Sequence, residues 1–190
     1  MGKILLIDNY DSFTFNLYHY LEQVTTDSVH VVRNDEISAE EAGEFDAIMI
    51  SPGPGLPVDA GITMEVLHRW HKTKKIMGIC LGHQAIGEAF GAQLRNLDVV
   101  HHGIATPVEV VAEDVIFKNI PVQFEVGRYH SWVIVEKSLP HDLVITAKDA
   151  AGEIMALRHA SFNVCGVQFH PESIMTPDGL QMIRNWVESK

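Results

Sequence analysis

Residues 74–91, KKIMGICLGHQAIGEAFG, place the strongest constraint on what this chain can fold into. The run KIMGI predicts a short buried strand, and from Gly82 onward the apolar residues recur at the three- and four-residue spacing of a helix. Cys80 lies where the period changes. The segment therefore predicts a strand, a tight turn with a cysteine at its tip, and a helix.

Cys80 is flanked by glycines in the pattern Gly-X-Cys-X-Gly, the thiol counterpart of the nucleophile elbow Gly-X-Ser-X-Gly. Gly78 and Gly82 lack the Cβ atoms that would crowd a strained turn between a strand and a helix. The positive end of the helix dipole favours the thiolate of Cys80, and the backbone N–H of Leu81 is placed to bind an oxyanion. An ordinary buried cysteine in a strand-to-helix turn is the alternative that this pattern alone leaves open.

The rest of the chain predicts an α/β fold in one domain, residues 1–190. Its first half alternates strand-like and helical segments joined by short loops, which predicts a parallel sheet with helices on both faces. Its second half is rich in strand-like segments and predicts antiparallel additions on one side of the sheet, followed by a last helix. The expected strands are 3–7, 29–32, 47–50, 76–79, 106–111, 122–126, 133–135, 143–146, 154–157 and 164–169, and the expected helical segments are 13–23, 38–42, 59–71, the one from residue 82 onward and 178–187.

Ligands of such sheets bind beyond the carboxyl ends of the strands, and two further segments belong at that edge with Cys80. The loop 51–55, SPGPG, follows an expected strand, and its prolines and glycines make it rigid and close-packed. The polar turn 8–12 follows the first strand, and Asp11 or Ser12 can cap the helix after it. The sequence DNYDSF around this turn therefore indicates either a simple helix cap or a binding or interface role.

A second chemical motif, VQFHPES, follows the last expected strand. On an extended backbone His170 and Glu172 point to one face, and Pro171 between them favours that geometry. A histidine that accepts a thiol proton needs an orienting acceptor on its other nitrogen, which Glu172 can provide. Taken alone, the motif is more typical of a surface histidine beside a solvated glutamate, since the chain has 11 histidines. Together with Cys80 and the glycine-rich loop, it predicts one Cys-His-Glu site.

Charge and composition exclude several classes of protein. A formal net charge of −11 and no cluster of Lys and Arg disfavour nucleic-acid and anionic-membrane partners. No apolar run reaches the roughly 20 residues of a membrane helix, and the start MGKILLIDNY meets an aspartate too early for a secretory signal. Two widely separated cysteines then indicate reduced thiols, and we expect a cytoplasmic protein.

The motifs GICLGHQ and VQFHPES and the start IDNYDSFTFNL resemble those of class I glutamine amidotransferases, in particular the subunits that serve chorismate-using synthases. The resemblance spans essentially the whole chain. It implies a flavodoxin-like, three-layer fold that hydrolyses L-glutamine through a thioester on Cys80, with His170 as base and acid and Glu172 orienting it. It also implies a synthase partner that receives the ammonia to make anthranilate for tryptophan, or alternatively aminodeoxychorismate for folate. No cofactor or metal is implied.

The resemblance assigns further residues to the site. The oxyanion donors would be the backbone N–H groups of Gly55 and Leu81. The glutamine-binding positions would be Gly53, Pro54, Gly55, Gln84, Ser131 and Trp132. Two positions depart from the family pattern, since Trp132 stands where leucine is usual and Ile104 stands where a lysine commonly follows the His-Gly pair. A backbone contact tolerates the first departure. The second lies near the surface expected to face the partner, so the family's partner contacts near Ile104 are not carried over to this chain.

Two other functions fit the same residues. A stand-alone γ-glutamyl hydrolase or cysteine peptidase would need no partner, and a catalytically silent binding subunit would not use Cys80 as a nucleophile. The remaining candidates have simpler explanations: His68 and His71 have no third metal ligand nearby and favour a solvated helix face, and His101 and His102 favour a loop. Cys165, inside an apolar strand, is interpreted as a core residue.

Overall fold

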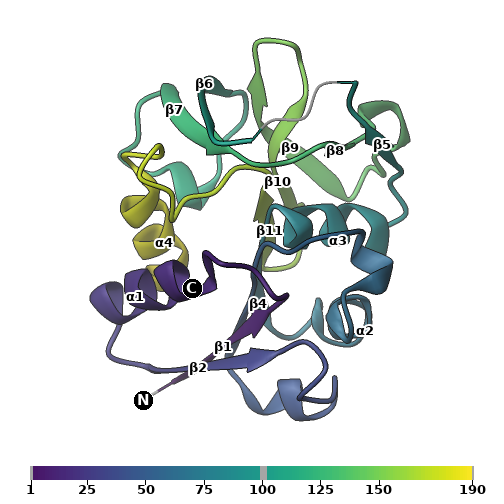
Figure 1. Cartoon of the computed structure of the whole chain (residues 1–190), viewed down its shortest axis with the longest axis vertical. Helices are drawn as coiled ribbons and strands as arrows, with labels where there is room; N and C mark the ends of the chain where they lie inside the picture. Colours follow the sequence, from purple (N-terminus) through teal and green to yellow (C-terminus); the bar gives the residue numbers. More distant parts are fainter. Residues whose placement is uncertain (1, 99–101, 190) are drawn as a thin grey trace.

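A computed structural model describes residues 2–98 and 102–189 and contains, among these residues, a nine-stranded sheet and a separate two-stranded sheet. The spatial order of the large sheet is β2 (Ser28–Arg33), β1 (Lys3–Asp8), β3 (Ala47–Ile50), β4 (Lys75–Ile79), β11 (Val164–Val167), β10 (Ile154–His159), β9 (Leu143–Asp149), β6 (Ile104–Val110) and β7 (Gln123–Arg128). Figure 1 shows this sheet running through the middle of the molecule.

The large sheet has a parallel half and an antiparallel half that meet at β11. Neighbouring strands from β2 to β11 are parallel, in the order typical of flavodoxin-like folds. β10, β9, β6 and β7 then add antiparallel strands on one side. The predicted α/β fold, a mostly parallel core with antiparallel additions, is confirmed.

Two pairs of helices cover the parallel half (Figure 1), with α1 (Thr14–Val24) and α4 (Gly179–Glu188) on one face and α2 (Thr63–Trp70) and α3 (Leu81–Ala89) on the other. Alternate residues of β1 supply the two cores, since Leu6 packs with α1 and α4 while Leu5 packs with α2 and α3. Burying each such side chain contributes about 1.5–3 kcal/mol. These two apolar layers fix the strands whose ends carry the site.

Some elements differ from the sequence-based expectation. The helix expected at 59–71 is α2 preceded by a 3₁₀ turn, Pro57–Asp59, because Gly61 adopts φ +52° against the Asn34 carbonyl and interrupts it. The turn expected at 38–42 is a 3₁₀ helix at Glu41–Glu44, and two further 3₁₀ helices lie at Val115–Phe117 and Glu136–Ser138. The strand expected at 133–135 does not join the large sheet. It is β8 (Trp132–Ile134), which pairs with an unexpected strand, β5 (Leu94–Asn96).

His83, in the first turn of α3, is fully buried against β11. A Cβ at Gly166 would lie 3.1 Å from His83 Nδ1, so the glycine makes room for the imidazole. Burial lowers the pKa of His83 from 6.5 to about 4, although the nearby Gly166 backbone acts in the opposite direction. The folded protein therefore holds a neutral imidazole at a pH where the unfolded chain is already protonated.

This difference predicts a loss of stability in mild acid. Below pH 6.5 His83 is protonated in the unfolded chain but remains neutral in the folded protein. The free energy of unfolding therefore falls with pH until the pH reaches about 4. The full loss is about 3 kcal/mol. Urea unfolding across this range should show a shallower pH dependence for His83→Gln than for the parent. His68→Gln, at an exposed position of α2, is the control, and equal slopes for His83→Gln and the parent would contradict the prediction.

Candidate active site

Cys80 occupies a strained turn between β4 and α3, as the Gly-X-Cys-X-Gly pattern predicts. Its backbone has φ +52° and ψ −98°, in the region that L-residues avoid. A Cβ at Gly78 would lie 2.3 Å from the Gly82 backbone, and a Cβ at Gly82 would lie 2.6 Å from the Ile50 carbonyl oxygen. Only glycine fits at both positions, so the two glycines allow the close packing that holds Cys80 at the tip.

His170 and Glu172 meet as predicted, but not for the predicted reason. His170 Nδ1 lies 2.7 Å from Glu172 Oε1, and both side chains are buried. However, β11 ends at Val167, and Pro171 and Glu172 lie in a turn in which the Ser173 N–H donates to the His170 carbonyl. The turn, not an extended strand, brings the carboxylate back to the ring, and a proline suits its second position.

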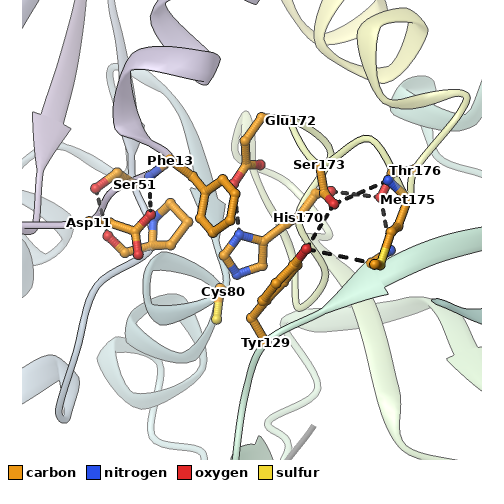
Figure 2. A network of polar contacts seen from close by, with 12 residues as sticks. Asp11, Phe13, Ser51, Cys80, Tyr129, His170, Glu172, Ser173, Met175 and Thr176 are labelled. Carbon is orange, nitrogen blue, oxygen red and sulfur yellow. Dashed lines mark hydrogen bonds and ion pairs between the residues drawn. The ribbon is translucent and has the colours of Figure 1, made fainter. Parts of the chain in front are cut away.

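His170 is anchored and charged by its surroundings (Figure 2). Its backbone N–H donates to the Gly127 carbonyl at 3.0 Å, and its carbonyl accepts from the Thr176 hydroxyl at 2.7 Å. Burial lowers the pKa of His170, but interactions with Cys80 and Glu172 outweigh it and raise this pKa well above its ordinary value. The His170 Nε2 atom is buried and has no hydrogen-bond partner of good geometry among the described residues, 2–98 and 102–189. The ring can therefore hold a proton beside the sulfur.

Two aromatic rings pack on His170 that the sequence did not mark as part of the site. The Tyr129 ring lies 4.8 Å from the imidazole, centroid to centroid, and the Phe13 ring lies 5.6 Å from it. Tyr129 and Phe13 also contact each other at 5.2 Å, and the Tyr129 hydroxyl lies 3.2 Å from Ser173 Oγ. Figure 2 shows the imidazole between these rings with Cys80 below it. The only sequence signal for Phe13 is its place in DNYDSF.

A cavity of about 200 Å³ opens beside Cys80 and collects the residues expected to bind glutamine. Gly55 adopts φ +78° there, a conformation that glycine tolerates and other residues rarely adopt. Leu81 is the first residue of α3, where backbone N–H groups lack helical partners, but it does not line this cavity. The lining residues are Gly53, Pro54, Gly55, Cys80, Gln84, Tyr129, His130, Ser131 and Trp132.

Buried amides connect the cavity wall to the sulfur. Gln84 Nε2 donates to the Trp132 carbonyl at 3.0 Å and to Gln168 Oε1 at 3.3 Å. Gln168 Nε2 in turn lies 3.6 Å from Cys80 Sγ. Gln168 is not among the expected site residues, although it lies within VQFHPES, because nothing in the motif shows that its side chain turns toward Cys80.

A buried ion pair, Arg128 with Asp149, supports the side of the cavity formed by Trp132. Arg128 Nη1 and Asp149 Oδ2 lie 2.6 Å apart, with both side chains more than nine-tenths buried. Arg128 Nε donates to His130 Nε2 at 3.1 Å, which leaves His130 Nδ1 to donate to the Trp132 carbonyl at 3.1 Å. The pair thus orients the Trp132 carbonyl through His130. Sequence reasoning missed it because Asp149 is distant along the chain.

The other sequence candidates lie outside this site. Cys165 is buried in β11, where burial raises the pKa of its thiol well above the ordinary value, so its interpretation as a core residue is confirmed. His68 is exposed, as expected, but the solvated position expected for His71 is wrong, because His71 is half-buried. Its ring packs on Phe90 and Phe162, and its Nδ1 lies 2.9 Å from the Leu67 carbonyl. His102 is exposed and described, whereas His101 lies outside the described residues.

A larger hollow, of about 860 Å³, contains none of the expected site residues. It lies beside Asp114, Phe117 and Arg158. Size alone therefore does not identify the site, and the chemistry around Cys80 does.

None of the helices within residues 2–98 and 102–189 has the length and apolar character that a membrane span requires.

Comparison with known sequences points to one family. A sequence model described as Glutamine amidotransferase class-I matches residues 5–189. The chain is 41% identical to anthranilate synthase component 2 of Leptospira biflexa, covering 98% of this chain and all of that protein. It is 46% identical to anthranilate synthase component 2 of Lactococcus lactis, covering 97% and 93%. It is 43% identical to aminodeoxychorismate/anthranilate synthase component 2 of Bacillus subtilis, covering 98% and 96%.

Solved structures give the same fold. A protein from Thermoplasma acidophilum that is described as a proposed component of GMP synthase superposes with a TM-score of 0.87 at 26% identity, covering 98% of this chain and 92% of that one. A glutamine amidotransferase from Thermotoga maritima superposes with a TM-score of 0.75 at 15% identity, covering 98% and 96%. The second comparison supports the fold alone.

Proposed function

Because this chain belongs to the class I glutamine amidotransferase family, we propose that it hydrolyses L-glutamine and delivers ammonia to a chorismate-using synthase subunit. The observation that carries the proposal is the strained Cys80 turn beside a buried His170–Glu172 pair, which is the arrangement an activated thiol needs. The synthase we propose is anthranilate synthase, in tryptophan biosynthesis. The relatives from Leptospira biflexa and Lactococcus lactis, each named anthranilate synthase component 2, are 41% and 46% identical over 100% and 93% of their length.

In the proposed first step, the Cys80 thiolate attacks the side-chain carbonyl carbon of glutamine. The carbonyl π electrons move to oxygen, and the resulting oxyanion accepts hydrogen bonds from the Gly55 and Leu81 backbone N–H groups. His170 then donates its Nε2 proton to the amide nitrogen, the C–N bond breaks, and ammonia leaves. A γ-glutamyl thioester remains on Cys80. The raised pKa of His170 supports this role, because the ring starts the cycle protonated.

The second step returns the enzyme to its starting state. Neutral His170 takes a proton from water, the hydroxide attacks the thioester carbonyl, and the C–S bond breaks to release the Cys80 thiolate. The new γ-carboxylic acid loses its proton to solvent and leaves as glutamate. Glu172 keeps the ring oriented and stabilises the imidazolium in both steps. The 2.7 Å contact between Glu172 and His170 Nδ1 supports that assignment, since it leaves Nε2 as the atom that exchanges protons.

The cavity beside Cys80 is proposed to bind glutamine. Gln84, the backbone at Ser131 and Trp132, and the loop Gly53, Pro54 and Gly55 line it, and its volume of about 200 Å³ suits a small amino acid. The amide chain from Trp132 through Gln84 to Gln168 supports a rigid wall, so the carbonyl carbon of a bound substrate would meet the sulfur in one orientation.

The alternative partner is an aminodeoxychorismate synthase subunit, in the folate pathway, which would receive the ammonia instead. The Bacillus subtilis relative, whose name includes both activities, favours this alternative at 43% identity. The acceptor site would lie on the partner, so purification of the complex and assay with chorismate and glutamine would identify the product.

We further propose a cytoplasmic location, since both cysteines are free thiols.

The assignment of Cys80 predicts a variant that separates glutamine use from synthesis. Cys80→Ser should lower glutamine-dependent activity of the complex by at least about 1,000-fold, because a serine hydroxyl is a far weaker nucleophile in this site. Activity with an ammonium salt should stay within about twofold of the parent, because the acceptor site is untouched. Cys165→Ser is the matched control and should retain glutamine use. Retained turnover of glutamine by Cys80→Ser would contradict the assignment.

A second prediction concerns the partner. Ammonia released to solvent is protonated and lost as a nucleophile, so useful hydrolysis must be coupled to an occupied acceptor site. We expect steady-state glutamate release at saturating glutamine to rise at least about tenfold when chorismate and the synthase partner are added. Equal rates with and without the partner would instead favour a stand-alone γ-glutamyl hydrolase.

A further inference from the structure

The turn of residues 9–13, between β1 and α1, touches both halves of the catalytic centre. Tyr10 adopts φ +62°, which is uncommon for a residue with a side chain, and is 52% exposed. Its hydroxyl donates to the Asp35 carboxylate at 2.8 Å, and the Arg33 guanidinium carbon lies 5.0 Å from its ring centroid. Strain of this kind persists only where surrounding contacts hold it. The turn therefore has a constrained shape.

At one end, Asn9 holds the loop that carries Gly55. Asn9 is 3% exposed, its backbone N–H donates to Ser51 Oγ at 2.9 Å, and its Nδ2 donates to the Ser51 carbonyl at 3.0 Å. Its Oδ1 accepts from Asn34 Nδ2 at 2.9 Å and from Thr63 Oγ1 at 3.2 Å. A Cβ at Gly53 would lie 2.6 Å from Asn9 Cβ. The proposed oxyanion loop thus rests directly on Asn9.

At the other end, Phe13 holds the imidazole. Its ring meets His170 edge to face at 5.6 Å and contacts Tyr129, which itself packs on His170. Such aromatic contacts contribute about 0.5–1.5 kcal/mol beyond the area they bury. Together with Glu172, which fixes Nδ1, Phe13 and Tyr129 limit how far the ring can tilt away from the sulfur.

Side-chain hydrogen bonds hold the turn between these two ends in one conformation. The Asp8 carboxylate accepts from the Thr14 hydroxyl at 2.8 Å and from the Asp11 N–H at 3.3 Å. The Asp11 carboxylate accepts from the Phe13 N–H at 2.8 Å. Figure 2 shows Asp11, Phe13 and Ser51 on one side of the catalytic imidazole. These bonds brace the segment between Asn9 and Phe13 against the end of β1 and the start of α1.

We propose that residues 9–13 form a positioning element in which Asn9 sets the oxyanion loop and Phe13 sets the His170 ring, as one coupled unit. The inference rests on the proposed glutaminase function and assigns a role to the DNYDSF segment, which that function leaves unexplained. Neither side chain reacts with substrate. Their effect is geometric, and a displacement of about 1 Å in such a site can cost roughly 100-fold in rate.

The test compares single and double variants in the complex with the synthase partner. Asn9→Ala should lower kcat for glutamine about 10- to 100-fold and change KM less than about threefold, because oxyanion contacts form only after attack. Phe13→Leu should lower kcat about 5- to 10-fold, whereas Phe13→Tyr, which keeps the ring, should stay within about twofold. The double variant should lose at least about fivefold less than the product of the single losses, since both act through one unit.

Asn16→Ala is the matched control, because Asn16 is exposed on α1 and makes none of these contacts. It should leave kcat unchanged. Losses that simply multiply in the double variant would overturn the coupling. An increase in KM at unchanged kcat for Asn9→Ala would overturn the positioning role.

A failure of the proposed function would look different, since the parent complex would then release no glutamate. In that case amide hydrogen exchange in the segment 51–55 decides the inference. Faster exchange in Asn9→Ala than in Asn16→Ala would support the hold of Asn9 on this loop, and equal exchange in the two variants would overturn it.

Discussion

The proposed active centre depends on the backbone conformation at Cys80. A residue with φ +52° costs about 1–3 kcal/mol and survives only where its neighbours leave no alternative. Here the Gly78 and Gly82 backbones are too close for any Cβ, and Gly82 packs on the end of β3 at Ile50. The Cys80 N–H donates to the Val167 carbonyl at 2.8 Å, which ties the turn to β11. Packing of β3, β4, β11 and α3 therefore stabilises the position of the sulfur at the tip of the turn.

The two halves of the sheet contribute different chemistry to this centre. The parallel half supplies Cys80 and the loop with Gly55, each at the carboxyl end of a strand. The chain after β11 supplies His170, which is pinned to Gly127 at the antiparallel side. Glutamine would then sit at the seam, between the loop after β3 and the segment before β8. A centre divided in this way exists only when both halves have folded and docked.

Much of this arrangement could be predicted from the sequence, because short motifs report local backbone geometry. The Gly-X-Cys-X-Gly spacing predicts the elbow and HPE predicts the orienting pair, although the turn after Val167 resembles a strand in the sequence, since Pro171 suits both. Long-range contacts leave no such signal. Gln168 beside the sulfur, Asp149 paired with Arg128, and Phe13 against His170 are ordinary residues in the sequence and become informative only once the fold brings them together. Strand β5, which pairs with β8, is missed because its three residues are too few to show a periodicity.

The central claim is that Cys80 carries the acyl group during glutamine hydrolysis, and acid quenching followed by peptide mass spectrometry tests it most directly. The complex would be mixed with glutamine, quenched during turnover, digested and analysed. The account predicts one γ-glutamyl group on the peptide that contains Cys80 and none on the peptide that contains Cys165. Glutamate release with no acyl group on Cys80, or with the label on Cys165, would contradict it.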